Sequence, residues 1–395
     1  MKEVYLDNAA TTKIDEAVMK DVIDCYTNKF GNASSIYKIG REARACVEDS
    51  REKIAKIFDS KPEEIYFTSG GSESDNMAVK GIAHAYRNKG KHIITSKIEH
   101  PAVLETCKAL EKEGFLVTYI GVDENGIVDL EELKSAIRPD TILISIMFAN
   151  NEIGTIEPIK EIGEIAKEHN IIFHTDAVQA VGALKIDVKA LNIDAMSLSG
   201  HKFYGPKGIG ALYLKQGIVI DKLICGGHQE KNKRAGTENV PAIVGMAKAL
   251  ELAYEGMEER DKKIKELRDY YEENIIEKIP YIKLNGDKSN RLPGTSNISF
   301  RLIEGEGLLL NLDLKGICAS SGSACTSGSL DPSHVLLAIG LTHEVAHGSL
   351  RISIGKYNTK DEIDYLIDSL VEIVGRLREM SPLWEKFIEE EEVWI

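Results

Sequence analysis

The sequence predicts an α/β protein whose mainly parallel sheet is covered by helices on both faces. Short apolar, strand-like runs alternate with amphipathic helical stretches from about residue 15 to about residue 255. Alternation of this kind is typical of parallel sheets, because the crossover between two parallel strands usually contains a helix. The expected strands cover residues 64–68, 92–96, 141–148, 170–175, 194–199 and 210–214.

A second, smaller α+β domain is expected after a long helical pattern that starts near Pro241 and is interrupted at Gly256. Strand-like runs and one helical run follow at 296–300, 317–320, 350–354 and 361–379. We therefore expect a large domain over residues 15–257. Residues 1–14 and 258–395 are expected to form the small domain.

The overall charge and the cysteine content narrow the class of protein. The formal net charge is −14, which argues against binding to nucleic acid or to an anionic membrane, since both need a basic surface. No apolar stretch has the length of a transmembrane helix, and the first residues lack the apolar run of a signal peptide. Six cysteines without a CxxC pair do not make a disulfide framework. We therefore expect a cytoplasmic protein.

Polar side chains follow the expected strands, at the place where open α/β sheets bind ligands. The first strand is followed by SGGSESDN, a glycine-rich turn with Ser72 at an expected helix N-cap, and free N–H groups there suit a phosphate. The residues that follow the later strands are His100, Asn150, Asn151, Asp176, Gln179, His201 and Lys202. Each alone is most simply a turn, a cap or a structural residue. Together they place an imidazole, amides, a carboxylate and an amine on one edge of one sheet.

This set of groups matches the needs of pyridoxal 5′-phosphate (PLP). PLP requires an amine for a Schiff base, a carboxylate that keeps its ring nitrogen protonated, and a phosphate site. A protonated ring nitrogen makes the cofactor an electron sink for negative charge at a substrate α-carbon. Lys202, in the loop SGHKFYGPKGIG between two strand-like runs, is the expected Schiff-base lysine.

Cys325 is a second candidate reactive group. It lies in CASSGSACTSGS, residues 318–329, where small side chains predict an accessible loop instead of a core. An exposed cysteine can act as a nucleophile when its thiolate is favoured, whereas a buried one is usually inert. We assign structural roles to the remaining cysteines, Cys25, Cys46, Cys107, Cys225 and Cys318.

The run HEVAH at residues 343–347 formally matches the zinc-protease pattern. Zinc binding would need a helix long enough to hold both histidines on one face, and a third ligand. Gly348 follows at once and SLRISIG then reads as a strand, so the helix would be about one turn long. We interpret the match as accidental and expect no resident metal.

A family resemblance runs through nearly the whole chain. The segments that carry it, in order, are YLDNAATT, FTSGGSESDN, EHPAVLET, NNEIGTIEP, HTDAVQ, SLSGHKFYGPKGIGALY, RAGTENV, SSGSACTSG and LRISIG. In this order they resemble cysteine desulfurases of the NifS/IscS type. The resemblance implies a homodimeric PLP enzyme of fold type I, with a seven-stranded sheet in its large PLP-binding domain and the Cys325 loop on its small domain. Such enzymes convert L-cysteine to L-alanine and leave a persulfide on the enzyme.

The resemblance also implies roles for individual residues. Lys202 matches the Schiff-base lysine and Cys325 the persulfide-forming cysteine. His100 matches the imidazole that stacks on the cofactor ring and takes part in catalysis. Asp176 matches the partner of the ring nitrogen, and Gln179 the donor to the ring hydroxyl.

Further matches concern the phosphate and the substrate. The residues that match phosphate contacts are Gly71, Ser72, Ser199 and His201, with Thr237 contributed by the other subunit. Asn151, which also contacts the cofactor, and Arg351 match the groups that hold the substrate carboxylate. A guanidinium suits that role because it pairs with a carboxylate bidentately. One departure is Gly-Gly-Ser at 70–72, where many relatives have Gly-Ala-Thr; serine keeps the hydroxyl.

Several points stay open at this stage. The sulfur acceptor implied by the resemblance is an iron–sulfur scaffold protein, a tRNA-thiolation protein or another sulfur carrier, and Cys325 is a candidate ligand for a transferred iron–sulfur cluster.

The alternative function is that of a selenocysteine lyase, or of another PLP-dependent lyase or aminotransferase of the same fold. Cys325 favours desulfuration over transamination, which needs no such thiol. A scaffold-binding protein without activity is disfavoured by the presence of Lys202, Asp176 and Cys325. The C-terminal SPLWEKF either binds a partner or packs on the small domain.

Overall fold

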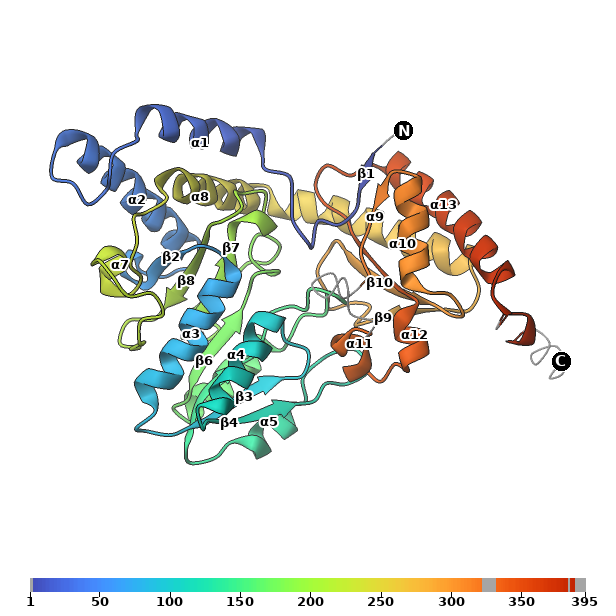
Figure 1. The fold of residues 1–395 in the computed structure, drawn as a ribbon, viewed down its shortest axis with the longest axis horizontal. Coiled ribbons are helices and arrows are strands. Elements are labelled where there is room, and N and C mark those ends of the chain that lie inside the picture. The colour runs from blue at the N-terminus through green and yellow to red at the C-terminus, as the bar shows by residue number, and fades with distance from the viewer. Residues whose placement is uncertain (1–2, 322–331, 383, 388–395) are drawn as a thin grey trace.

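The fold was analysed in a computed structural model that describes residues 3–321, 332–382 and 384–387. Its centre is a seven-stranded sheet (Figure 1). The strands, in their order across the sheet, are β2 (Ile65–Thr68), β8 (Gly210–Leu214), β7 (Ala195–Ser199), β6 (Ile172–Asp176), β5 (Thr141–Ser145), β3 (His92–Ser96) and β4 (Leu116–Ile120).

The direction of the strands brings most of their carboxyl ends to one edge. β8 is antiparallel to both of its neighbours, β2 and β7, and all other neighbouring pairs are parallel. β2 therefore points the same way as β7, and every strand except β8 ends on the same edge of the sheet.

Both faces of the sheet are buried, which explains the nearly continuous apolar strand sequences. Successive side chains of a strand point to opposite faces. Ile172 of β6 accordingly packs into the apolar cluster under one set of helices, and Phe173 into the cluster under the other. The helices on the side of Ile172 are α3 (Gly71–Tyr86) and α4 (Pro101–Lys112). Those on the side of Phe173 include α1 (Glu16–Asn28), α2 (Lys38–Ile57), α5 (Leu130–Ala136), α6 (Ile159–Glu168) and α8 (Val240–Glu255).

A separate apolar core lies in the other half of the molecule, on the right of Figure 1. Its sheets are β9 (Ile282–Asn285), β10 (Thr295–Phe300) and β12 (Ser349–Ser353), all antiparallel, and the short parallel pair β1 (Val4–Tyr5) and β11 (Ile317–Cys318). The helices of this half are α9 (Met257–Lys278), α10 (Gly305–Leu314), α11 (His334–Ala338), α12 (His343–His347) and α13 (Lys360–Glu379). Val4 and Leu6 pack into this core. The domain limits 15–257 and 258–395 stay predictions.

Most expected elements are present, with some differences in detail. All expected strands of the large sheet form, but the run 141–148 is a strand only to Ser145. The sequence reading missed β4, β9 and the two-residue β1, and β11 is shorter than 317–320. Gly256 separates α8 from α9, as expected.

The structure tests two local predictions, the N-cap of α3 and the length of the HEVAH helix. Ser72 is not the N-cap of α3, because the helix starts earlier: Gly70 is its N-cap, and Ser72 lies in the first turn. The HEVAH segment forms the five-residue helix α12, which stops at Gly348 before β12 starts. A helix of that length is the single turn that the sequence predicted.

The last described residues pack against the small core. The rings of Trp384 and Phe387 lie 5.6 and 5.0 Å from the ring of Tyr281. This answers the question left by SPLWEKF in favour of packing for these two rings. Among the described residues, every helix is too short or too polar to cross a lipid bilayer.

Candidate active site

Lys202 lies at the common edge of the sheet, in the loop between β7 and β8. It ends the short 3₁₀ turn η2 (Gly200–Lys202), which directly follows β7. Gly208 adopts a φ of +75°, a conformation that suits glycine, and lets the chain turn back so that β8 pairs with β7. The Lys202 ammonium donates hydrogen bonds to the carbonyl oxygens of Ala9 and Ala10, at 2.5 and 2.9 Å.

Asp176 is the last residue of β6, and its carboxylate is buried beside the sheet edge. One oxygen accepts a hydrogen bond from the Val178 amide at 2.9 Å. Burial raises the pKa of Asp176, while His100 and Lys202 lower it. The structure thus brings an amine and an imidazole within electrostatic reach of one buried carboxyl group.

His100 is fixed by the start of helix α4. It is the N-cap residue, and its Nδ1 accepts a hydrogen bond from the Ala102 amide at 3.1 Å. Nδ1 is then the unprotonated nitrogen, so Nε2 carries the proton of the neutral ring. Burial lowers the pKa of His100, and so does Lys202, whereas Asp176 opposes the shift. We conclude that His100 presents a neutral imidazole to the site.

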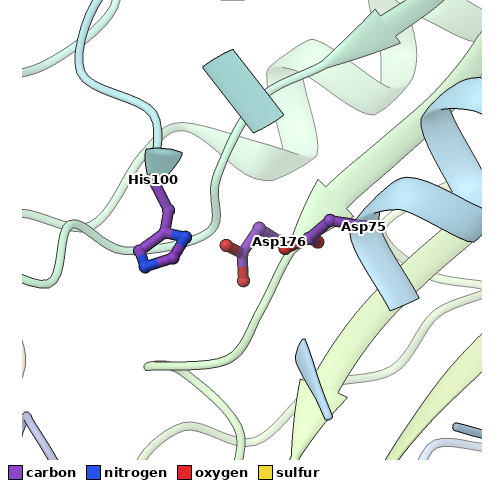
Figure 2. A group of neighbouring side chains, drawn as sticks. All are labelled: Asp75, His100 and Asp176. Carbon is purple, nitrogen blue, oxygen red and sulfur yellow. The ribbon is translucent and has the colours of Figure 1, made fainter. Parts of the chain in front are cut away.

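Asp75, His100 and Asp176 form one cluster, with a ligand atom of each within 4.8 Å of the others. Figure 2 shows Asp176 between the other two side chains. Two carboxyl groups and an imidazole are also a set of metal ligands. The ammonium of Lys202, however, interacts electrostatically with both His100 and Asp176. Its positive charge repels a metal ion at the same place and so disfavours metal binding.

The start of α3 offers a phosphate cradle. Gly70, the N-cap, has no side chain to cap the helix, so first-turn amides point outward without that partner. A Cβ on Gly71 would come within 2.7 Å of Val178, and Ser199 also lies against this glycine. Only glycine therefore fits against Val178 at the first position of the helix, and Ser72 is exposed beside it.

Two further predicted residues, His201 and Gln179, contact the N-terminal segment that also contacts Lys202. Nδ1 of His201 lies 3.1 Å from the Thr11 hydroxyl. Burial lowers the pKa of His201 to about 4, so His201 would contact a phosphate as a neutral ring. Gln179 donates to the Ala9 carbonyl at 3.0 Å, the same oxygen that accepts from Lys202.

Arg351 reaches the site from the small core. It lies on β12, is buried, and donates one hydrogen bond to the carbonyl oxygen of Asn151 at 2.9 Å. A second guanidinium nitrogen forms an ion pair with Asp7 at 2.7 Å, and the Nε atom has no partner among the described residues. The structure thus brings Arg351 and Asn151 together, although 200 residues separate them in the sequence.

Cys325 and Thr237 are not placed in the site by the described residues. Cys325 lies outside them; on its N-terminal side they end at Ser321, and the backbone of Ser320 pairs with that of Arg351. Thr237 is exposed, and its role in a second subunit stays a prediction.

Sequence reasoning missed Asp7 and Asp75. The sequence spacing could have pointed to Asp75, because it lies four residues after Gly71 and therefore on the same face of α3 as the expected phosphate site. Asp7 gives no such signal, because its partner Arg351 is far away in the sequence.

The residues present fit PLP. The amine of Lys202, the buried carboxyl of Asp176 and the uncapped start of α3 are the three features that this cofactor requires, and they lie on one edge of one sheet.

Comparison with known proteins identifies the family. The class-V aminotransferase family matches residues 4–366. A cysteine desulfurase IscS from Methanosarcina thermophila is 58% identical over 385 residues, covering 98% of this chain and 95% of its own. Another from Clostridium botulinum is 56% identical over 393 residues, or 99% of both chains. A solved structure named as a NifS-like protein superposes with a TM-score of 0.90 at 41% identity, covering 95% of this chain and all of its own.

The fold, the PLP-type site and these full-length matches agree, and the chain belongs to the class-V aminotransferase family and, within it, to the cysteine desulfurases.

Proposed function

We propose that this protein is a PLP-dependent cysteine desulfurase that takes sulfur from L-cysteine and releases L-alanine. The relatives named cysteine desulfurase IscS match this chain over nearly their whole length. The observation that carries the proposal is the position of Lys202. Its ammonium lies close enough to the buried carboxyl of Asp176 and to the His100 imidazole to shift the pKa of both groups.

The residues of the chain have distinct tasks in this proposal. When bound, PLP supplies an electron sink that stabilises negative charge on the substrate α-carbon. Asp176 holds the ring nitrogen, and the start of α3 with Ser199 and His201 holds the phosphate. Lys202 holds the cofactor and, when free, takes the α-proton of the substrate. His100, neutral and fixed through Nδ1, would contact the cofactor ring and keeps a proton on Nε2 for the reaction.

The substrate carboxylate is assigned to Arg351 and Asn151. A guanidinium in a buried position binds a carboxylate strongly, because little water competes for the charge. The Nε of Arg351 is buried without a hydrogen-bond partner among the residues described, and the other two nitrogens contact Asn151 and Asp7. We propose that the substrate carboxylate takes the place of one of these contacts.

Cys325 is the proposed sulfur acceptor within the enzyme. Its thiolate attacks the sulfur of the substrate, a sulfur–sulfur bond forms, and the bond between the substrate Cβ and sulfur breaks. The electron pair of the broken bond stays with Cβ, which takes up a proton and becomes the methyl group of alanine, so the oxidation of the sulfur is balanced by the reduction of Cβ. The product on the enzyme is a persulfide. We propose that an iron–sulfur scaffold protein, a tRNA-thiolation protein or another carrier in the cytoplasm takes this sulfur.

Two exposed regions support the proposed homodimer. Helices α1 and α2 and the segment that joins them, at the end of the molecule far from the small core in Figure 1, carry exposed apolar side chains. These are Ile23, Tyr26, Phe30, Ile36, Tyr37 and Ile39. Exposed apolar side chains gathered in one part of the chain favour a protein interface. The segment before Thr237 is held to α3 by an ion pair of Arg234 with Glu73 at 2.8 Å, which leaves exposed Thr237 to reach a second subunit.

Replacement of Cys325 by alanine tests the desulfurase proposal. We expect sulfide and alanine, formed in equal amounts by the parent under reducing conditions, to fall by about a hundredfold or more, since the nucleophile is lost. The visible absorption band of bound PLP should stay. Cys318→Ala is the matched control and should leave turnover unchanged. Undiminished sulfide release by Cys325→Ala would contradict the persulfide role and favour another PLP-dependent lyase.

Replacement of Asp7 by alanine tests the role of Arg351. Asp7 orients the guanidinium, so its loss should raise the KM for L-cysteine by about tenfold, with a smaller change in kcat. Asp7→Asn keeps an oxygen acceptor for the guanidinium and should change KM less. Steady-state kinetics of both variants give the KM values. An unchanged or lower KM for L-cysteine in Asp7→Ala would contradict the assignment of Arg351 to the substrate carboxylate.

Introduction of charge in the segment that precedes helix α2 tests the dimer. Ile36 has 89% of its surface exposed in the single chain, and Ile36→Glu should shift the enzyme toward monomers in sedimentation velocity runs. Met380→Glu, at a 73% exposed residue after α13, is the control and should stay dimeric. If Ile36→Glu and the parent sediment alike, the interface lies elsewhere.

A further inference from the structure

Asp75 is a buried acidic residue that the proposed function does not use. It lies on α3, which packs on β6 and β7, and its side chain is 1% exposed. A ligand atom of its carboxyl group lies within 4.8 Å of one in Asp176 (Figure 2). Its Oδ1 has no hydrogen-bond partner among the described residues. A carboxyl group in such a place calls for a physical explanation, because unpaired buried charge is costly.

The groups that face Asp75 give it no positive charge. His174 of β6 lies 3.7 Å away, but burial lowers the pKa of His174 to about 3, so its ring is neutral. That ring is also engaged by the hydroxyls of Ser145 and Ser197, at 2.9 and 3.0 Å. From the other elements, the acidic groups Asp176 and Glu99 face Asp75. The Ser197 hydroxyl also hydrogen-bonds to Asp75 and lowers its pKa, but burial and Asp176 outweigh this effect.

Asp176, by contrast, has a cation beside it. The ammonium of Lys202 favours the ionised form of Asp176, whereas the neutral ring of His100 adds no charge. Two carboxyl groups this close in a buried site do not both ionise readily, so the pair holds one negative charge. Burial and the charge of Asp176 raise the pKa of Asp75 well above its ordinary value, so the proton of the pair belongs on Asp75.

We propose that Asp75 is a positioning residue that stays protonated and uses its hydroxyl hydrogen to hold Asp176 ionised and oriented toward the cofactor. The proposal rests on the proposed function, because it gives Asp176 the ring nitrogen of PLP as its partner. A neutral donor behind a carboxylate stabilises the charged form and makes it less basic. The proton between Asp176 and the ring then stays on the ring nitrogen, where the electron sink needs it.

Two variants of Asp75 distinguish a hydrogen-bond donor from a residue that only fills space. Asp75→Asn keeps the size and a hydrogen-bond donor but cannot ionise, whereas Asp75→Ala has no donor. Glu157→Gln is the matched control: Glu157 is also buried, burial raises its pKa to about 8, and it bonds the Val128 amide away from the cluster. Thermal unfolding of each variant first establishes that it folds.

Infrared spectroscopy of the enzyme without cofactor gives the first readout. We expect the difference between the parent and Asp75→Asn to show the lost carbonyl band of a protonated carboxylic acid at neutral pH. Loss of carboxylate bands instead would mean that Asp75 is ionised, and would overturn the proposal.

The second readout is the ¹⁵N chemical shift of the ring nitrogen in enzyme loaded with labelled PLP. In Asp75→Ala the shift should move toward the value of an unprotonated ring, and kcat should fall by roughly ten- to hundredfold, as expected for the loss of one hydrogen bond to a charged group. Asp75→Asn and Glu157→Gln should stay close to the parent. A parent-like shift in Asp75→Ala, or equal losses in Asp75→Asn and Asp75→Ala, would overturn the proposal.

These readouts are independent of the proposed activity. If the parent binds PLP with a protonated ring but releases no sulfide, the desulfurase proposal fails while the role of Asp75 is still tested by the infrared and ¹⁵N results.

Discussion

The buried carboxyl group of Asp176 is the constraint around which the site is organised. It ends the central strand β6, where parallel neighbours leave it little contact with water. A charge in such a place must be compensated, and the ammonium of Lys202, after β7, compensates it. The neutral imidazole of His100, after β3, lies in the same cluster. Because β8 reverses direction, the start of α3 after β2 reaches the same edge. The chemistry of the site thus follows from the topology of the sheet.

The N-terminal segment 7–12 connects this edge to the small core. The Ala9 carbonyl accepts from Lys202 and Gln179, and the hydroxyl of Thr12 donates to the carbonyl oxygen of His201. On the other side, Asp7 pairs with Arg351, and the side chain of Asn8 donates to the Ser353 carbonyl. One short stretch therefore contacts both the residue that would hold the cofactor and the residue that would hold the substrate carboxylate.

Much of this arrangement could be predicted from local sequence patterns, and the rest could not for physical reasons. The strands of the large sheet are apolar on both faces, so they stand out as continuous runs, and the polar residues after them mark the edge. β4 was missed although its sequence, LVTYI, is rich in strand-favouring residues; it is an edge strand and Leu116 is exposed. The start of α3 was placed too late because Gly70, which has no side chain, takes the N-cap position.

Contacts between distant segments were beyond such patterns. The ion pair of Asp7 with Arg351 depends on how two halves of the chain meet, and no periodicity records it. The pairing of Asp75 with Asp176 likewise depends on how α3 lies on β6. The assignment of Lys202 came from its chemistry and from the family resemblance, and the structure adds the reason that this lysine is suitable: its ammonium lies within electrostatic reach of Asp176.

The most direct measurement is to identify the lysine that holds PLP. The holoenzyme would be reduced with borohydride, digested and analysed by mass spectrometry. The account predicts a stable phosphopyridoxyl group on Lys202 and on no other lysine. A modification on a different lysine, or none on an enzyme that has bound PLP, would contradict it.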